Sequence, residues 1–152
     1  MQQLKIKQQL FDLCKDFVNK RLQTVEEIIS SNQKALQSET KSSAGDKHET
    51  GRAMLQLEME KASQQLEGIS IMNQILSKID ISKSSKIAHL GSVIITENAT
   101  YFLSISAGQL SLDKKNYFAI SVSSPIGKML LGKKENEEVS FNGNLIKIKE
   151  VF

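Results

Sequence analysis

The chain has 152 residues, of which 39% are hydrophobic and 24% are charged, so it is slightly less apolar than an ordinary globular domain of its size. This composition favours a small domain joined to an extended element over one large core. The net charge of +3 is too small to predict nucleic acid as the primary ligand, and the single cysteine excludes an internal disulfide framework and a cysteine-built zinc site.

Residue types are distributed unevenly along the chain. Only two of the eight aromatic residues precede residue 90, whereas eleven of the twelve glutamines do. We therefore expect a solvated helical element in residues 1–80 and a compact β-rich domain in residues 81–152. Charges punctuate the N-terminal segment, and no apolar run reaches the roughly 18 residues of a membrane span. The expectation is a soluble cytoplasmic protein without a membrane partner.

Two apolar stripes with helical spacing dominate residues 1–80. Their members recur every three or four residues and are Phe11, Cys14, Val18, Leu22, Val25 and Ile29 in the first stripe, and Leu55, Met59, Ala62, Leu66, Ile69, Met72, Leu76 and Ile79 in the second. Small polar residues around Ser42–Gly45 predict a turn between them. Two helices of about 35 residues, each about 50 Å long, are then expected to form an antiparallel coiled-coil hairpin within a monomer.

An arm of this length has little core of its own. Two interpretations remain open at this point: an oligomerisation element, or a probe that carries chemistry at its tip. The tip, near residues 46–49, holds Asp46 and Glu49, whose spacing places both carboxylates on one face of the first turn of the second helix. The pair is typical of helix capping, but two exposed carboxylates also suit Mg²⁺ shared with another protein.

The other polar candidates carry less specific signals. His48 is expected to be solvated, and His89 lies too far along the chain to complete a metal-binding spacing with it. Arg52, three residues after Glu49, is placed to pair with it on the helix surface. Cys14 belongs to the apolar stripe, which favours a small buried hydrophobe over a nucleophile.

The pattern changes to β-type segments after Asp80. Strands are predicted at Ser92–Glu97, Thr100–Ser106, Tyr117–Val122, Glu138–Phe141 and Leu145–Val151, the last two as a hairpin around Asn142–Asn144. Between them, Ser124 as N-cap, Pro125 at the first position and Gly132 as terminator predict one short helix. An antiparallel sheet covered by one helix makes a small α+β domain.

The segment from Ser123 to Lys134, with the sequence SSPIGKMLLGKK, is followed by Glu138 and Val139. It resembles the C-terminal signature of the bacterial GreA/GreB transcript cleavage factors. The resemblance covers nearly the whole chain, and it implies an N-terminal coiled-coil hairpin followed by an FKBP-like domain.

The resemblance to the Gre family also implies a function. Gre factors insert the hairpin through the secondary channel of RNA polymerase, where two tip acids in an Asp-x-x-Glu arrangement help to hold a Mg²⁺ ion of the polymerase active site. Asp46 and Glu49 match that arrangement. The implied protein is an accessory factor that stimulates the polymerase's own cleavage of backtracked RNA. It is not an enzyme alone, and it contacts nucleic acid only within the polymerase complex.

Two features leave alternatives open. Thr50, Gly51, Arg52 and Ala53 replace the asparagine, small residue, acid and aromatic residue that usually follow the family's glutamate. This departure favours a secondary-channel regulator that does not cleave. A coiled-coil interaction or dimerisation protein with an inert tip is a further alternative. The loop Ser123, Ser124, Pro125 and Ile126 is the expected docking edge on the polymerase, and a helix cap without contacts is its alternative interpretation.

Overall fold

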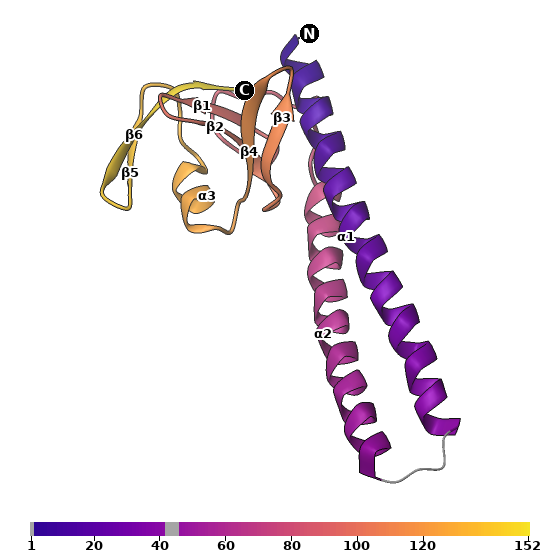
Figure 1. Ribbon diagram of the computed structural model, residues 1–152. Coiled ribbons are helices and arrows are strands. Elements are labelled where there is room, and N and C mark those ends of the chain that lie inside the picture. Colours follow the sequence, from indigo (N-terminus) through magenta and orange to yellow (C-terminus); the bar gives the residue numbers. More distant parts are fainter. Residues whose placement is uncertain (1, 42–45) are drawn as a thin grey trace. The chain divides into compact units, whose positions relative to one another are not determined.

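The computed structural model describes the backbone of residues 2–41 and 46–152 and the side chains of residues 2–38 and 50–152. The chain forms two compact units, one made of Val18–Met72 and the other of Met1–Phe17 together with Asn73–Phe152. Two long helices, α1 (Gln2–Lys41) and α2 (Asp46–Ser77), precede the strands and the short helix α3 (Pro125–Leu130) (Figure 1). The predicted α+β class with an N-terminal helical hairpin is therefore confirmed.

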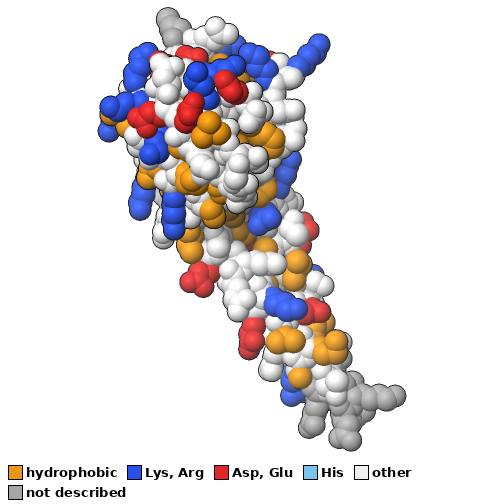
Figure 2. Space-filling view, turned by 90° about the vertical axis from the view of Figure 1, so that its left-hand side faces the viewer, with side chains coloured by type: hydrophobic (Ala, Val, Ile, Leu, Met, Phe, Trp, Pro, Cys, Tyr) orange, Lys and Arg blue, Asp and Glu red, His pale blue; other side chains and the backbone are white. Residues whose placement is uncertain are grey.

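Unit Val18–Met72 consists of the two facing helices. The predicted stripes are confirmed here, because Val25, Ala62 and Ile69 are buried while the intervening polar residues are exposed. Asn32, which is 7% exposed, interrupts the apolar seam. On the face drawn in Figure 2, charged side chains of both signs and hydrophobic side chains are interspersed along the helices. The helices have 40 and 32 residues rather than about 35 each.

The second unit is built on a sheet. Its strands are β1 (Val93–Thr96), β2 (Thr100–Ser104), β3 (Gly108–Leu112), β4 (Lys115–Ser121), β5 (Glu138–Phe141) and β6 (Asn144–Val151), in the order β3-β4-β2-β1-β6-β5. Within the described chain, every neighbouring pair is antiparallel except β2 and β4, which are parallel. The expectation of an antiparallel sheet is wrong at this pair. The chain leaves β2, forms the β3–β4 hairpin, and returns so that β4 lies between β3 and β2.

The turns of the β5–β6 and β3–β4 hairpins explain why the sequence predicted the first hairpin and not strand β3. Asn142 and Gly143 have φ of 51° and 80°, the left-handed conformation that a two-residue hairpin turn requires, and the predicted hairpin is confirmed. The β3–β4 turn uses Asp113 and Lys114, with φ of 50° and 66°. Lysine is uncommon in this conformation, so strand β3 was not predicted.

A bulge accounts for the irregular pattern of β6. Ile146 and Ile148 are buried, and the next buried residue is Val151 rather than Glu150. In the pairing with β1, Ile95 faces Glu150 whereas Thr96 faces Ile148, so Lys149 is skipped. The extra residue shifts the alternation of side chains by one position, so Val151 rather than Glu150 points to the buried face, as is usual at a β-bulge.

The first turns of α1 belong to the sheet unit. Lys7 is 1% exposed, and its Nζ donates a hydrogen bond of 2.8 Å to the carbonyl oxygen of Lys83. Burial lowers the pKa of Lys7, and the nearby carboxylate of Asp80 opposes that shift. Gln3 also donates to the Glu150 carboxylate at 3.0 Å. These bonds tie the start of the chain to its last strand and to the segment after α2.

One hydrophobic core cluster of the sheet unit lies between the sheet and α3. Its buried members are Ala88, Ile94, Leu103, Leu130, Val139, Ile146, Ile148 and Val151. Half-buried Ile126 packs against this core from the first turn of α3.

None of the described helices is long and apolar enough to cross a membrane.

Candidate functional site

The tip of the hairpin holds the predicted acidic pair. Helix α2 begins at Asp46, so Asp46 and Glu49 both have helical backbone in its first turn. Their side chains lie outside the described residues, as does that of His48. The backbone thus provides the helical spacing on which the prediction depends, and the joint orientation of the two carboxylates stays a prediction.

Arg52 lies one turn further along α2. The side chain is half-buried, and its Nε is fully buried without a hydrogen-bond partner among the described residues. Asn32 of α1 likewise has a buried Nδ2 without a partner in the described chain. A buried N–H group without an acceptor costs about 1–3 kcal/mol. The described side chain one turn along α2 from the acidic pair is therefore a cation, Arg52, rather than a further carboxylate.

Hydrogen bonds among its own residues hold the loop before α3 in place. Ser124 is the N-cap: its Oγ accepts from the backbone N–H of Gly127 at 3.1 Å and donates to the carbonyl oxygen of Ser121 at 2.6 Å. The backbone N–H of Ser123 donates to the hydroxyl of Ser121 at 3.1 Å. The predicted capping role of Ser124, with Pro125 at the first helical position, is confirmed.

Gly127 fixes the shape of this loop through close packing. A Cβ at this position would lie 1.9 Å from the carbonyl oxygen of Ser121, so no larger residue fits without a backbone shift. Ser124 and Ile126 thus have structural roles, as cap and as core contact. The exposed side chains of Ser123 and Pro125 are the members of the predicted docking loop that another protein can reach.

The remaining candidates, Cys14 and His89, each lie close to a serine hydroxyl within the sheet unit. Cys14 is fully buried, and its Sγ lies 3.7 Å from the Ser104 hydroxyl. Burial raises the pKa of the thiol to about 11, an effect that the Ser104 hydrogen bond partly offsets, so Cys14 is protonated at neutral pH. Nδ1 of His89 lies 2.9 Å from the hydroxyl of Ser92, which is itself 0% exposed. Among the described residues, no group of three His, Cys, Asp or Glu could hold a metal.

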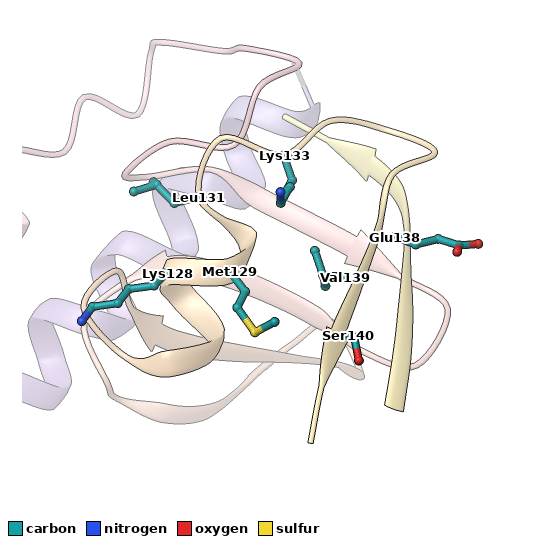
Figure 3. Close-up of a pocket in the computed structure, with 7 residues that line it drawn as sticks. All are labelled: Lys128, Met129, Leu131, Lys133, Glu138, Val139 and Ser140. Carbon is teal, nitrogen blue, oxygen red and sulfur yellow. The ribbon is translucent and has the colours of Figure 1, made fainter. Parts of the chain in front are cut away.

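A pocket that the sequence did not predict lies between α3 and β5. It has a volume of about 380 Å³ and is lined by Lys128, Met129, Leu131, Lys133, Glu138, Val139 and Ser140. In Figure 3, Met129, Lys133 and Val139 point toward the space between helix and strand, while Glu138 points away from it. A basic helix end followed by a short edge strand is the sequence signal, but the pocket depends on how these two elements pack.

Comparison with known proteins gives little beyond the fold. No family model matches the chain, and no curated protein matches it. One similar solved structure is the prokaryotic transcription elongation factor GreA/GreB from Nitrosomonas europaea, at 18% identity and a TM-score of 0.32. The match covers 65% of this chain and 91% of the other. Similarity at this level carries no functional argument.

Proposed function

We propose that this protein is an accessory factor of RNA polymerase that inserts its helical hairpin into the secondary channel and stimulates cleavage of backtracked RNA. One observation carries the proposal. Helix α2 begins at Asp46, so the Asp-x-x-Glu pair that resembles the Gre tip occupies the turn of helix next to the point where the hairpin reverses. The Gre-like segment Ser123–Lys134 follows in the same chain order, around α3.

The chemistry of the pair fits a shared Mg²⁺ ion. Mg²⁺ prefers oxygen ligands and typically takes one or two protein carboxylates while it keeps several waters. Asp46 and Glu49 would supply those carboxylates to the ion of the polymerase active site, and the ion would stabilise the charge that develops on the cleaved phosphate. The role of this chain is to carry two negative charges on a helix to a site that belongs to its partner.

The loop before α3 would provide docking. Ser123 and Pro125 are exposed, whereas Ser124 and Ile126 hold the loop in one shape. A loop that keeps its conformation on binding loses little conformational entropy, which favours specific contacts. Docking through Ser123 and Pro125 would position the hairpin while its tip acts elsewhere.

A second function, regulation of the polymerase without cleavage, is favoured by Arg52. Its guanidinium lies one turn from Glu49 on α2 and has a buried Nε without a described partner. A positive charge beside a Mg²⁺ site opposes binding of the cation. Under this proposal, the protein occupies the channel and its tip does not support the metal.

The test uses purified RNA polymerase in stalled, backtracked complexes. Asp46→Asn combined with Glu49→Gln removes both charges and keeps similar shapes, so we expect cleavage to fall to the level without factor while binding to polymerase is unchanged. Glu26→Gln with Glu27→Gln is the matched control, because it removes two exposed charges elsewhere on the hairpin. If the unmodified protein binds polymerase and never stimulates cleavage at any Mg²⁺ concentration, the non-cleaving function replaces the first.

A further inference from the structure

An exposed apolar face lies along the first turns of α2. Met54 is 63% exposed and Leu57 is 56% exposed, and Ala53 beside them is exposed as well. Residues three or four apart on a helix are neighbours on its surface, so these side chains adjoin one another. Apolar side chains that adjoin in this way, rather than stand singly, mark an interaction surface.

This apolar face continues the face that carries the acidic pair. Each residue of an α-helix advances by about 100° around the axis, so positions three or four apart share a face. Steps of three, four and four residues connect Asp46, Glu49, Ala53 and Leu57, and α2 is helical over all of them. Buried Ala62, in contrast, follows Leu57 by five residues, about 140° around the helix. A surface that meets the acidic pair therefore also faces Leu57.

The distance along the helix is short enough for one partner to reach both. Leu57 follows Glu49 by eight residues, which is about 12 Å at the rise of an α-helix. The only charged residue between them in the sequence is Arg52, which is half-buried and precedes Leu57 by five residues. The partner surface beyond the acidic pair is thus expected to be apolar, since a charged surface would lose its hydration against this face without gaining a charged partner.

The residue types of this face favour a protein surface over nucleic acid. Bases stack on aromatic side chains and arginine, and phosphates are bound by lysine and arginine. Ala53, Met54 and Leu57 provide none of these groups. Methionine and leucine suit an apolar protein surface instead, and methionine adapts to side chains of different shape.

A second copy of this chain fits the face poorly. Parallel pairing of two copies brings the acidic pair against the same pair of the other copy. Antiparallel pairing about Gln64 sets the same edge of the two faces together, so Glu60 of one copy lies near Glu67 of the other. Like charges oppose both arrangements.

We propose that Met54 and Leu57 dock on an apolar surface of RNA polymerase that lies beside its active-site Mg²⁺ ion. The contact holds the hairpin at the depth at which the acidic pair reaches the ion. It rests on the proposed function, because the shared face identifies the partner of Leu57 through the partner of Asp46 and Glu49. It adds a second contact to the one at Ser123 and Pro125.

The first experiment measures the affinity of the full-length protein for purified RNA polymerase and its stimulation of cleavage in backtracked complexes. Met54→Gln with Leu57→Gln removes the apolar contact, and glutamine is a good helix former. We expect the dissociation constant to rise about tenfold, and cleavage at saturating factor to stay within about twofold because Asp46 and Glu49 are retained. Ile28→Gln, at a 40% exposed apolar position of α1, is the control and should bind like the unmodified protein.

The outcomes separate this contact from the proposed function. Equal affinity of the double variant and the unmodified protein, with unchanged thermal melting of the helices, would overturn the contact and leave the proposed function standing. If the unmodified protein binds without cleavage, the non-cleaving function applies, and a tenfold loss of affinity still supports the contact. An unmodified protein that does not bind polymerase would overturn both.

The second experiment identifies what covers the face. Leu57 is replaced by the photoreactive amino acid benzoylphenylalanine, and the backtracked complex is irradiated. We expect a covalent product with a polymerase subunit, which disappears when excess unmodified protein competes for the complex. A product with RNA alone, or with a second copy of this chain in the absence of polymerase, would overturn the proposal.

Discussion

The two glycines at positions 68 and 127 show how differently the two units are built. A Cβ added at Gly127 would collide with the backbone of Ser121 at 1.9 Å, whereas one added at Gly68 would meet nothing within 4 Å. Gly127 lies in the sheet unit and Gly68 in the hairpin unit. Close packing determines the local shape of the α3 loop, while helix propensity and a narrow seam determine that of the hairpin. Substitutions on the exposed faces of the hairpin helices are therefore expected to disturb packing less than substitutions in the α3 loop.

Substitution of Gly127 should have the largest effect on stability. Gly127→Ala forces a backbone shift in the α3 loop, and we expect it to lower the free energy of unfolding of the sheet unit by roughly 3 kcal/mol. Both tyrosines, Tyr101 and Tyr117, lie in this unit, so tyrosine fluorescence during urea unfolding reports on it specifically. A change below about 0.5 kcal/mol, the level of an ordinary surface substitution, would contradict the packing argument.

Substitution of Asn32 in the hairpin unit, Val18–Met72, should change the free energy of unfolding by a smaller amount and in the opposite direction. Its Nδ2 is buried without a described partner, so Asn32→Leu removes an unsatisfied donor and fills the seam with an apolar group. We expect stabilisation by roughly 1–2 kcal/mol, measured by circular dichroism at the helix band during urea unfolding. Exposed Gln33→Leu is the control and should change stability by less than about 0.5 kcal/mol. Destabilisation by Asn32→Leu would mean that the amide has an acceptor.

Substitution of Gly68 should have the smallest of the three effects on stability, and it is the most direct comparison with Gly127. The residue is exposed within α2, and alanine is favoured over glycine in a helix interior by about 1 kcal/mol. Gly68→Ala should therefore raise the midpoint of helix unfolding, while tyrosine fluorescence of the sheet unit is unchanged. A loss of stability would show that the exposed face of α2 is restrained by a contact at this position.

Local signals in the sequence predicted the elements that depend on neighbouring residues. The apolar stripes with helical spacing identified the hairpin, Asn142 and Gly143 identified the last turn, and Ser124 with Pro125 identified the start of α3. Strand β3 was missed because Lys114 adopts a positive φ that lysine rarely takes. The parallel pairing of β2 and β4 was missed because it depends on where the chain returns, which no local pattern records.

Some features of the candidate sites could also be predicted from local sequence, and others could not. Spacing alone placed Asp46 and Glu49 in one helical turn, and the structure gives both positions helical backbone. Sequence reasoning could not separate the exposed Ser123 and Pro125 from Ser124 and Ile126, because burial depends on the packing of α3 against the sheet. The buried Lys7 has no sequence signal either, since its acceptor is a backbone carbonyl 76 positions away.

The bonds of α1 in the sheet unit have a consequence for the order in which the chain folds. Gln3, Lys7 and Cys14 contact residues that lie 147, 76 and 90 positions further along the chain. Unit Val18–Met72 is contiguous and has all its residues early in synthesis. The segment before it must wait until β2 and β6 have left the ribosome. The segment at the start of α1 is made before this unit, yet it is among the last to reach its native contacts, and until then Cys14 lacks its contact with Ser104.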